Sequence, residues 1–216
     1  TCNKKLVKLF EYNTPQEKFW AGNFGEEYID RNEGQDLLAS NLKFFSSALR
    51  LAPDISSCLE LGANIGMNLK ALKLLYPKID LKAVEINTSA ANTLGEFIGA
   101  KNVFQGSIFD YITNKKSDLV LIKTVLIHIN PKMLNAVYEK MYKNSSRYIL
   151  ICEYYNTTPV DINYRGHNDR LFKRDFAGEM LDKYPDLNIV DCGFAYHRIP
   201  PYMGGDITWF LLEKRP

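Results

Sequence analysis

The sequence is poor in cysteine, histidine and net charge, and each shortage argues against a class of function. Its 216 residues include 4 cysteines and 3 histidines, with no CxxC pair or Cys/His cluster of the kind that binds zinc. A formal net charge of +2 provides no strongly basic surface for nucleic acid. We therefore expect neither a metal site nor a nucleic-acid partner.

Long apolar runs are also missing, and none approaches the ~20 residues that a membrane-spanning helix needs. The first residues, TCNKKLVKLFEYN, lack the apolar centre of a secretion signal. Cys58, Cys152 and Cys192 lie in or beside apolar, strand-like runs, where we expect reduced and buried thiols. These features predict a cytoplasmic protein that does not bind membranes.

The composition otherwise has the ordinary balance of a globular protein, with 46% hydrophobic and 24% charged residues. A chain of this length is expected to form one domain with a substantial core. We expect residues 1–52 to add a lid and helices to a core formed by residues 53–216. The sequence does not indicate an oligomeric state.

After Pro53, short β-rich runs alternate with helical stretches. The expected strands lie at 57–62, 81–86, 101–106, at the start of 118–129, and at 147–155, with helices at 67–77, 88–98 and 131–144. Such alternation is typical of parallel β-α-β units. Two further strands, 187–193 and 206–214, have no helical pattern between them and can join only antiparallel. The sequence therefore predicts an α/β fold: a doubly wound, mostly parallel seven-stranded sheet with an antiparallel C-terminal strand.

The segment before the first strand has two parts. Residues 35–52, QDLLASNLKFFSSALRLA, form an amphipathic helical pattern. Residues 19–32, FWAGNFGEEYIDRN, are rich in aromatic side chains but have no helical period. We interpret the second part as a lid over a ligand rather than a packed helix.

The loop after the first strand, within CLELGANIGMN (58–68), has two glycines four residues apart. Ligands of doubly wound sheets bind beyond the carboxyl ends of the strands, so this loop is the expected site. Gly62 permits a sharp turn, and Gly66 permits a ligand or strand to approach the next helix. GANIGM matches neither the G-x-G-x-x-G of dinucleotide sites nor a triphosphate loop ending in G-K-[ST]. The pattern favours a ligand that has a nucleoside but no phosphate.

An acidic residue follows at a suitable distance. Glu85 ends the second strand in AVEIN, 25 residues after Glu60. A carboxylate at this position can accept hydrogen bonds from both hydroxyls of a ribose. Taken alone, Glu85 is equally well read as a solvated strand end, but together with the glycine loop it predicts a nucleoside site.

Four segments carry a resemblance to a known family. LELGANIGMN, AVEIN, NVFQGSIFD and SDLVLIKTVLIHI resemble, in order, the motifs of class I S-adenosylmethionine-dependent methyltransferases, whose fold is Rossmann-like. The resemblance implies S-adenosylmethionine as cofactor. It places Glu60, Gly62, Ala63 and Gly66 at the methionine part, Glu85 at the ribose, and Ile86, Ser107 and Ile108 at the adenine. The family often has an acidic residue where this chain has Ser107, with Asp110 further on.

FWAGNFGEEYIDRN and LIKTVLIHINP are more specifically similar to a small group of methylases associated with the biosynthesis of pseudaminic acid and related sugars. This similarity implies a methyl acceptor that is a small, anionic sugar or sugar nucleotide. It also implies a lid over the cofactor, formed by Phe19, Trp20, Tyr28 and Arg31. Arg31 would bind the methionine carboxylate, or else is a surface charge capping a helix.

A hydroxyl acceptor benefits from a general base, and histidine is the natural candidate. His128 follows the fourth strand at the carboxyl edge, where it is either a base or a residue that caps a helix or packs in the core. Glu153 ends the fifth strand, where it either orients a hydroxyl or contacts the neighbouring loop. Lys123 is a further candidate contact near the reacting methyl group.

An insertion after the fifth strand, about 156–175, has several basic residues. His167 is a second candidate base, and Arg165 and Arg170 suit a carboxylate or phosphate unless the run is simply a solvated face. His197 lies between the last two strands and would line the same pocket. Two other functions stay open: a methyltransferase for another small metabolite or a protein amine, and a non-catalytic module that binds the cofactor.

Overall fold

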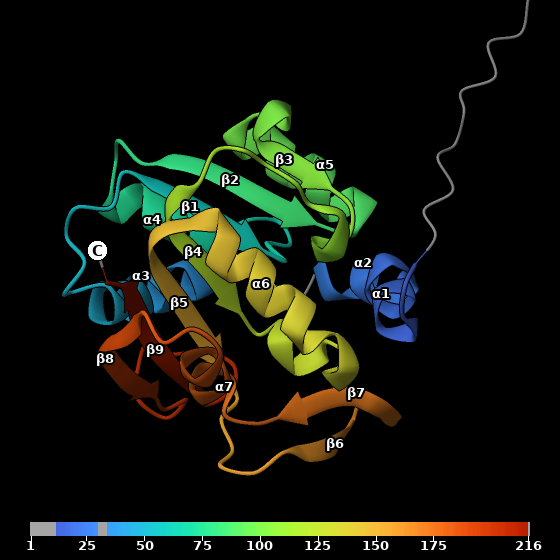
Figure 1. The fold of residues 1–216 in the computed structure, drawn as a ribbon. Coiled ribbons are helices and arrows are strands. Elements are labelled where there is room, and N and C mark those ends of the chain that lie inside the picture. Colours follow the sequence, from blue (N-terminus) through green and yellow to red (C-terminus); the bar gives the residue numbers. More distant parts are fainter. Residues whose placement is uncertain (1–11, 30–33, 216) are drawn as a thin grey trace, which may run out of the picture.

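The computed structural model describes residues 12–29 and 34–215. The predicted seven-stranded sheet is confirmed, with the order β3-β2-β1-β4-β5-β9-β8 (Figure 1). Its strands are β1 (Ser57–Leu61), β2 (Asp80–Glu85), β3 (Val103–Gln105), β4 (Ser117–Lys123), β5 (Ser145–Glu153), β8 (Leu187–Ala195) and β9 (Ile207–Lys214). The first five strands pair in parallel, and β9 runs antiparallel to both β5 and β8.

Helices cover both faces of the sheet. They are α3 (Gln35–Ala48), α4 (Met67–Leu75), α5 (Thr88–Ile98), α6 (Leu134–Asn144) and α7 (Phe176–Lys183). Short 3-10 turns lie at Ala100–Asn102, Ile108–Asp110, Leu126–His128 and Pro131–Met133. Side chains of α3 and α4 pack on one face, and side chains of α6 and α7 pack on the other. The predicted positions of α3, α4, α5 and α6 are confirmed, whereas the sequence pattern did not predict α7.

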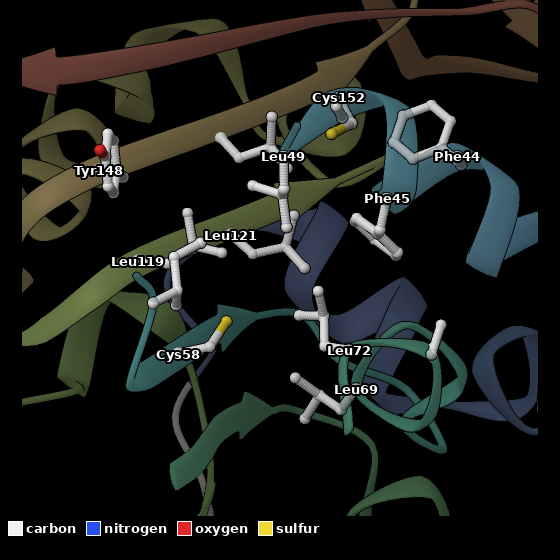
Figure 2. Packing of buried hydrophobic residues seen from close by; sticks show 14 of the residues in the cluster. Phe44, Phe45, Leu49, Cys58, Leu69, Leu72, Leu119, Leu121, Tyr148 and Cys152 are labelled. Carbon is white, nitrogen blue, oxygen red and sulfur yellow. The ribbon is translucent and has the colours of Figure 1, made fainter. Parts of the chain in front are cut away.

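The central strands β1 and β4 bury both of their faces, as parallel strands between helix layers must. Figure 2 shows Leu119 and Leu121 of β4 beside Cys58 of β1, on the face that α3 covers with Phe45. The intervening residues of β4 point to the other cluster of the core. The middle of the sheet is thus enclosed between helices, and polar side chains gather where its strands end.

The strand order reverses between β1 and β4, which makes this the topological switch point of the sheet. Leu61 of β1 is in register with Val84 of β2 and with Ile122 of β4. Since all three strands run in the same direction, the residues that follow them meet at one edge. This is the edge at which doubly wound folds bind ligands.

The N-terminal segment is helical, so the expectation that residues 19–29 do not form a helix is wrong. It forms two helices, α1 (Pro15–Ala21) and α2 (Asn23–Ile29). The first of them, α1, begins with a capping box: Thr14 Oγ1 accepts from Glu17 N (3.2 Å), and Glu17 Oε2 accepts from Thr14 N (2.8 Å). Pro15 at the first helical position reinforces this start. Gly22, in an extended conformation, ends α1.

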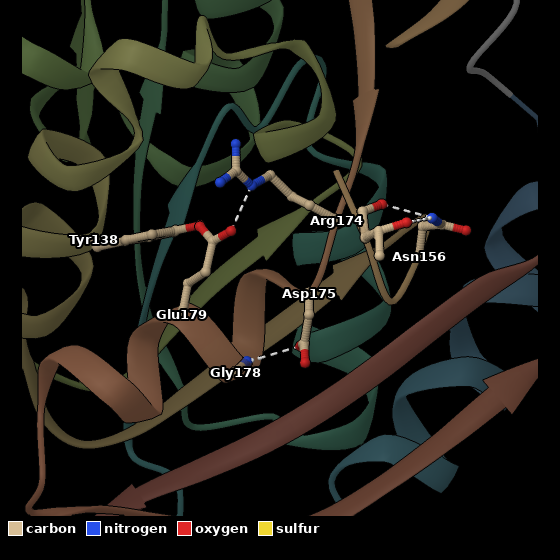
Figure 3. Close-up of polar contacts among 7 residues, drawn as sticks. Tyr138, Asn156, Arg174, Asp175, Gly178 and Glu179 are labelled. Atoms are coloured by element: carbon tan, nitrogen blue, oxygen red, sulfur yellow. Dashed lines mark hydrogen bonds and ion pairs between the residues drawn. The ribbon is translucent and has the colours of Figure 1, made fainter. Parts of the chain in front are cut away.

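The insertion after β5 is a separate two-stranded hairpin of β6 (Val160–Tyr164) and β7 (His167–Lys173). Figure 3 shows its anchor, where Arg174 Nε lies 2.5 Å from Glu179 Oε1 of α7. Tyr138 Oη of α6 donates to the other oxygen of Glu179 at 2.6 Å. Asp175 caps α7 by accepting from Gly178 N at 2.8 Å. The hairpin is therefore tied to the main body at its C-terminal end.

The cysteines of the sheet differ in their exposure. Cys58 and Cys152 are buried, but Cys192 is exposed, so the expectation of a buried thiol there is wrong. The reason is that Cys192 lies on β8, an edge strand of the sheet.

No helix of the described ranges is both long and apolar enough to cross a membrane.

Candidate functional site

A large cavity opens at the edge where β1, β2 and β4 end. It encloses about 1240 Å³ of empty space, including its open mouth. Its lining comes from α1, α2, α3 and the loops that follow β1, β2, β3 and β4.

Residues of the helices α1 and α2 line this cavity. Figure 1 shows the two helices beside each other at one end of the sheet. Gln16 Nε2 of α1 donates to the carbonyl oxygen of Asp169 in β7 at 3.0 Å. At the other side, Glu26 of α2 accepts from Asn87 Nδ2 (3.1 Å) and Ser89 Oγ (3.0 Å) at the start of α5. Trp20 and Tyr28 both line the cavity from these helices. The pair of helices thus bridges the hairpin and α5, in the position expected of a lid.

The two glycines of the loop after β1 have different roles. Gly62 lines the cavity with φ 77°, and a Cβ there would lie 2.6 Å from Val125 Cγ2. Gly66 has φ 82° and starts α4, where a Cβ would lie 2.6 Å from Leu94 Cδ1. Both residues are in the left-handed region that favours glycine. A side chain of α5 is therefore the close neighbour of Gly66.

Glu85 is the most constrained acid of the cavity. It is 7% exposed, so the reading as a solvated strand end is wrong. Its Oε2 accepts from Asn64 N and its Oε1 from Asn87 N, both at 2.7 Å. Burial raises the pKa of Glu85, and the backbone hydrogen bonds oppose that shift. A carboxylate has about four lone-pair sites, so Glu85 can still accept hydrogen bonds from a ligand.

A narrow apolar region adjoins Glu85. Ile86, Ile108 and Phe109 line it, together with Ser107. The hydroxyl oxygen of Ser107 accepts from Phe109 N at 3.1 Å, which leaves its proton available to a ligand acceptor. A flat ring with polar atoms at its edge fits such surroundings.

A polar network lies beyond Gly62. Lys123 Nζ donates to Oδ1 of Asn41 (3.1 Å) and of Asn68 (3.2 Å), and all three residues line the cavity. Behind them Glu60 is fully buried, and its Oε1 accepts from Asn68 Nδ2 at 2.6 Å. Burial raises the pKa of Glu60 to about 8 and lowers the pKa of Lys123. Glu60 Oε2 has no hydrogen-bond partner among the described residues. Glu60 therefore supports the cavity through Asn68 and does not line it.

His128 lines the cavity from the 3-10 turn after β4 and is 7% exposed. Its Nδ1 lies 2.6 Å from the carbonyl oxygen of Arg170. A carbonyl oxygen only accepts, so Nδ1 carries the proton and Nε2 of the neutral ring is an acceptor. Burial lowers the pKa of His128 to about 4, which keeps the ring neutral at pH 7. The ring also packs 4.6 Å from that of Trp20.

Glu153 is placed behind this turn. Its Oε1 accepts from Val125 N (2.9 Å) and Leu126 N (2.8 Å), the residues that lead into the turn of His128. Burial raises its pKa to about 8. Glu153 does not line the cavity, so it makes the structural contact with the neighbouring loop that the sequence left as one alternative.

Apart from Glu60, Gly66 and Glu153, the predicted site residues divide into three groups according to whether they line the cavity. Trp20, Tyr28, Gly62, Ala63, Glu85, Ile86, Ser107, Ile108, Lys123 and His128 all line the cavity. Arg165, His167, Arg170 and His197 do not. Arg31 lies outside the described residues.

The four residues outside the lining have other surroundings. His167 packs 5.1 Å from the ring of Phe19, and the Arg170 guanidinium lies 5.3 Å from the same ring. Arg165 is exposed in the turn of the hairpin. His197 pairs with Asp206 at 2.7 Å on the surface. Basic side chains and histidines of the insertion therefore do not converge on the cavity.

Several lining residues were not anticipated from the sequence: Thr14, Gln16, Glu17, Asn41, Asn64, Asn68, Asn87, Phe109 and Asn130. Two of them had a recognisable pattern, because T-P-Q-E at residues 14–17 is a capping box that starts a helix. Within the described ranges, no group of three or more His, Cys, Asp or Glu residues is arranged to hold a metal ion.

The chain was compared with families, curated sequences and solved structures of known proteins. Neither models of protein families nor curated protein sequences match the chain. Solved structures do match in fold. One is 1,6-didemethyltoxoflavin-N1-methyltransferase of Burkholderia thailandensis, with 1,6-didemethyltoxoflavin and S-adenosylhomocysteine bound, at a TM-score of 0.70 and 14% identity over 96% of this chain and 93% of that chain.

Two others are similar to this chain to nearly the same degree. Magnesium protoporphyrin IX methyltransferase of Synechocystis PCC 6803, with bound S-adenosylhomocysteine, has a TM-score of 0.66 and 11% identity over 92% of this chain and 98% of that one. Mitomycin 7-O-methyltransferase has a TM-score of 0.67 and 13% identity over 94% of this chain. The match spans only 61% of the mitomycin enzyme. This chain thus has the fold of class I S-adenosylmethionine-dependent methyltransferases.

Proposed function

We propose that this chain is a methyltransferase that binds S-adenosylmethionine in the cavity and methylates a small molecule. The observation that carries the proposal is the Glu85 carboxylate, held by two backbone amides beside the Gly62 turn. Such a fixed, buried acceptor suits the two hydroxyls of a ribose. Neighbours of the same fold, crystallised with S-adenosylhomocysteine, support the choice of ligand.

The residues present fit each part of this cofactor. Glu85 would bind the ribose, and the region of Ile86, Ile108 and Ser107 would enclose the adenine. The Lys123 network would hold the charged methionine end, for which Lys123 is the one basic side chain among the described lining residues.

When bound, the cofactor supplies a methyl group already activated by its sulfonium. The residues of the chain then position an acceptor and remove water, which α1 and α2 do by covering the cavity. His128 Nε2 is unprotonated at neutral pH and can take the proton that an acceptor hydroxyl loses as the methyl group is transferred.

A sugar or sugar nucleotide is the narrower acceptor that the sequence suggests. Polar side chains of α1 support sugar hydroxyls as the groups bound in the cavity. Arg165 and Arg170 do not line the cavity, so a carboxylate or phosphate of the acceptor would have to project outside it, toward the hairpin. Another small metabolite would use the same cavity, and a protein amine is the remaining alternative acceptor.

Calorimetric titration with S-adenosylhomocysteine tests the proposal. We expect micromolar binding by the wild-type chain and a loss of roughly tenfold or more in Glu85→Ala, since hydrogen bonds to charged groups contribute about 1.5–3 kcal/mol. Glu96→Ala, on the exposed side of α5, is the matched control and should bind as the wild type does. Absence of binding by folded wild-type protein would contradict the proposal.

The competing function, a module that binds the cofactor without catalysis, is separated by turnover. Incubation with methyl-labelled S-adenosylmethionine and pooled small-molecule extracts should yield labelled product and S-adenosylhomocysteine. Tight binding without any labelled product from such extracts would favour the non-catalytic module.

A further inference from the structure

One wall of the cavity consists of polar side chains that the cofactor assignment does not use. We call Gln16, Glu17 and Trp20 of α1, together with His128, the α1 wall; all four line the cavity. Gln16 and His128 are both anchored to β7, through the carbonyl oxygens of Asp169 and Arg170. The α1 wall is thus a fixed surface, at the end of β4 where the acceptor would meet the methyl group.

Glu17 is the charged member of this wall. It is 7% exposed, and its Oε2 is engaged by Thr14 N at 2.8 Å and Thr14 Oγ1 at 3.3 Å. Its Oε1 is buried and has no hydrogen-bond partner among the described residues. A buried carboxylate oxygen without a donor is costly, so a ligand that supplies a donor would be stabilised there.

Other side chains of the α1 wall also carry hydrogen-bond acceptors that lack a donor. Gln16 is 5% exposed, and because its Nε2 donates to Asp169, its Oε1 is left as a buried acceptor without a partner in the described ranges. Nε2 of His128 is likewise an acceptor. Trp20 Nε1 is the one donor of the α1 wall that lacks a partner. The residues of the α1 wall thus carry three acceptor atoms that lack a donor, against one donor that lacks an acceptor.

The distribution of charge leads to the same conclusion. Lys123 is the basic residue of the described lining, and it is bound to Asn41 and Asn68 from α3 and α4. No ion pair to Glu17 is present in the part of the chain that the structure describes. An anion bound at the α1 wall would meet the Glu17 carboxylate without a compensating cation.

From this geometry we infer that the α1 wall is the acceptor subsite and that it selects groups bearing hydrogen-bond donors, namely hydroxyls or an amine, over carboxylates and phosphates. Glu17 is its specificity-determining residue. The inference rests on the proposed function, because that function defines the acceptor. It also separates the bound part of the acceptor from any anionic group, which the cavity would leave outside.

The variant Glu17→Gln isolates this role. Glutamine also serves at the third position of a capping box, so the start of α1 is preserved. Its amide oxygen can replace Oε2 toward Thr14, which puts an NH2 donor at the place of the unpartnered Oε1. The substitution thus removes the charge and converts an acceptor into a donor. Glu96→Gln, the same change on the exposed side of α5, is the control.

Ligand-observed NMR on protein saturated with S-adenosylhomocysteine provides the measurement. The probes are built on two scaffolds, a pyranose and a phenyl ring, each bearing a hydroxymethyl, an aminomethyl or a carboxylate group. We expect the hydroxymethyl and aminomethyl probes of at least one scaffold to bind wild type and Glu96→Gln roughly tenfold more tightly than the carboxylate. In Glu17→Gln that preference should disappear or reverse.

Cofactor binding is read separately in the same samples. If wild type and Glu17→Gln bind S-adenosylhomocysteine equally well, the proposed function stands whatever the probes do. If the wild type does not bind S-adenosylhomocysteine, the proposed function itself fails. Tighter binding of the carboxylate probes, a preference unchanged in Glu17→Gln, or no binding of any donor-bearing probe would each overturn the inference.

Discussion

Nδ1 of His128 lies 2.6 Å from the carbonyl oxygen of Arg170, which joins the turn after β4 to the β6–β7 hairpin. The contact fixes the tautomer of the ring, so that Nε2 is the basic nitrogen. A backbone carbonyl is the partner, and this role does not depend on the Arg170 side chain. The hairpin thus contributes to the site through its backbone, although its basic side chains do not line the cavity.

Replacement of His128 tests its role as a base. We expect His128→Gln to lower the rate of methyl transfer to a hydroxyl acceptor by about 10²–10⁴, the usual contribution of general acid–base catalysis. The affinity for S-adenosylhomocysteine should be unchanged. His167→Gln, on the exposed part of the hairpin, should retain the wild-type rate within about twofold. A full rate in His128→Gln would show that His128 is not the base.

His128 should also make stability depend on pH. Its pKa is lowered from 6.5 to about 4 in the folded state, so the unfolded chain binds the proton more tightly. The contribution to stability is therefore full above pH 6.5 and is lost as the pH falls toward 4. Between pH 7 and pH 4.5 the free energy of unfolding of His128→Gln should fall by roughly 2–3 kcal/mol less than that of the wild type. Urea denaturation at both pH values measures the difference, and parallel decreases would contradict it.

Glu153 should matter for stability through the two amides that it accepts from. Glu153→Ala leaves Val125 N and Leu126 N without their acceptor and should cost about 2–5 kcal/mol, whereas Glu153→Gln keeps an amide oxygen and should cost much less. Burial raises the pKa of Glu153 from 4.5 to about 8, so its carboxyl destabilises the fold increasingly as the pH rises through that window. Thermal unfolding should thus favour Glu153→Gln over the wild type more at pH 8.5 than at pH 5. An equal difference between the two proteins at both pH values would argue against a raised pKa.

Gly66 and Gly166 provide a matched pair for the effect of packing. Both have a positive φ, 82° and 84°, but a Cβ at Gly66 would meet Leu94 at 2.6 Å, whereas nothing lies within 4 Å of one at Gly166. We expect Gly166→Ala to cost about 1 kcal/mol from backbone strain alone, and Gly66→Ala to cost about 1–3 kcal/mol more. Denaturant unfolding measures both variants, and equal costs would mean that Leu94 moves aside freely.

Much of the fold was predictable because burial leaves a periodic pattern in the sequence. The apolar runs ending at Glu85 and Lys123 and the helical stripes between them are sufficient to define the parallel sheet. The helices α1 and α2 were missed because the capping box of Thr14 and Glu17 precedes the aromatic stretch, whose residues do not repeat with a helical period. The exposure of Cys192 depends on the position of β8 at the edge of the sheet, which no local pattern records.

The site divides along the same lines. Residues that directly follow parallel strands, such as Gly62, Glu85 and Lys123, must meet at one edge, and the structure brings them together. Arg165 and Arg170 belong to a hairpin outside the main sheet, and the side to which such an insertion turns its side chains depends on tertiary contacts. For Glu17 the sequence indicates a helix cap, but it contains no sign that the second oxygen would be left beside the cavity.

The central claim is that the edge beyond β1, β2 and β4 binds S-adenosylmethionine, and a crystal structure with S-adenosylhomocysteine in excess tests it most directly. We predict electron density for the nucleoside between Glu85 and Ile108, with both ribose hydroxyls on Glu85 and the amino-acid end at Lys123. An empty cavity in crystals whose protein binds the compound in solution, or density for it elsewhere on the surface, would contradict the account.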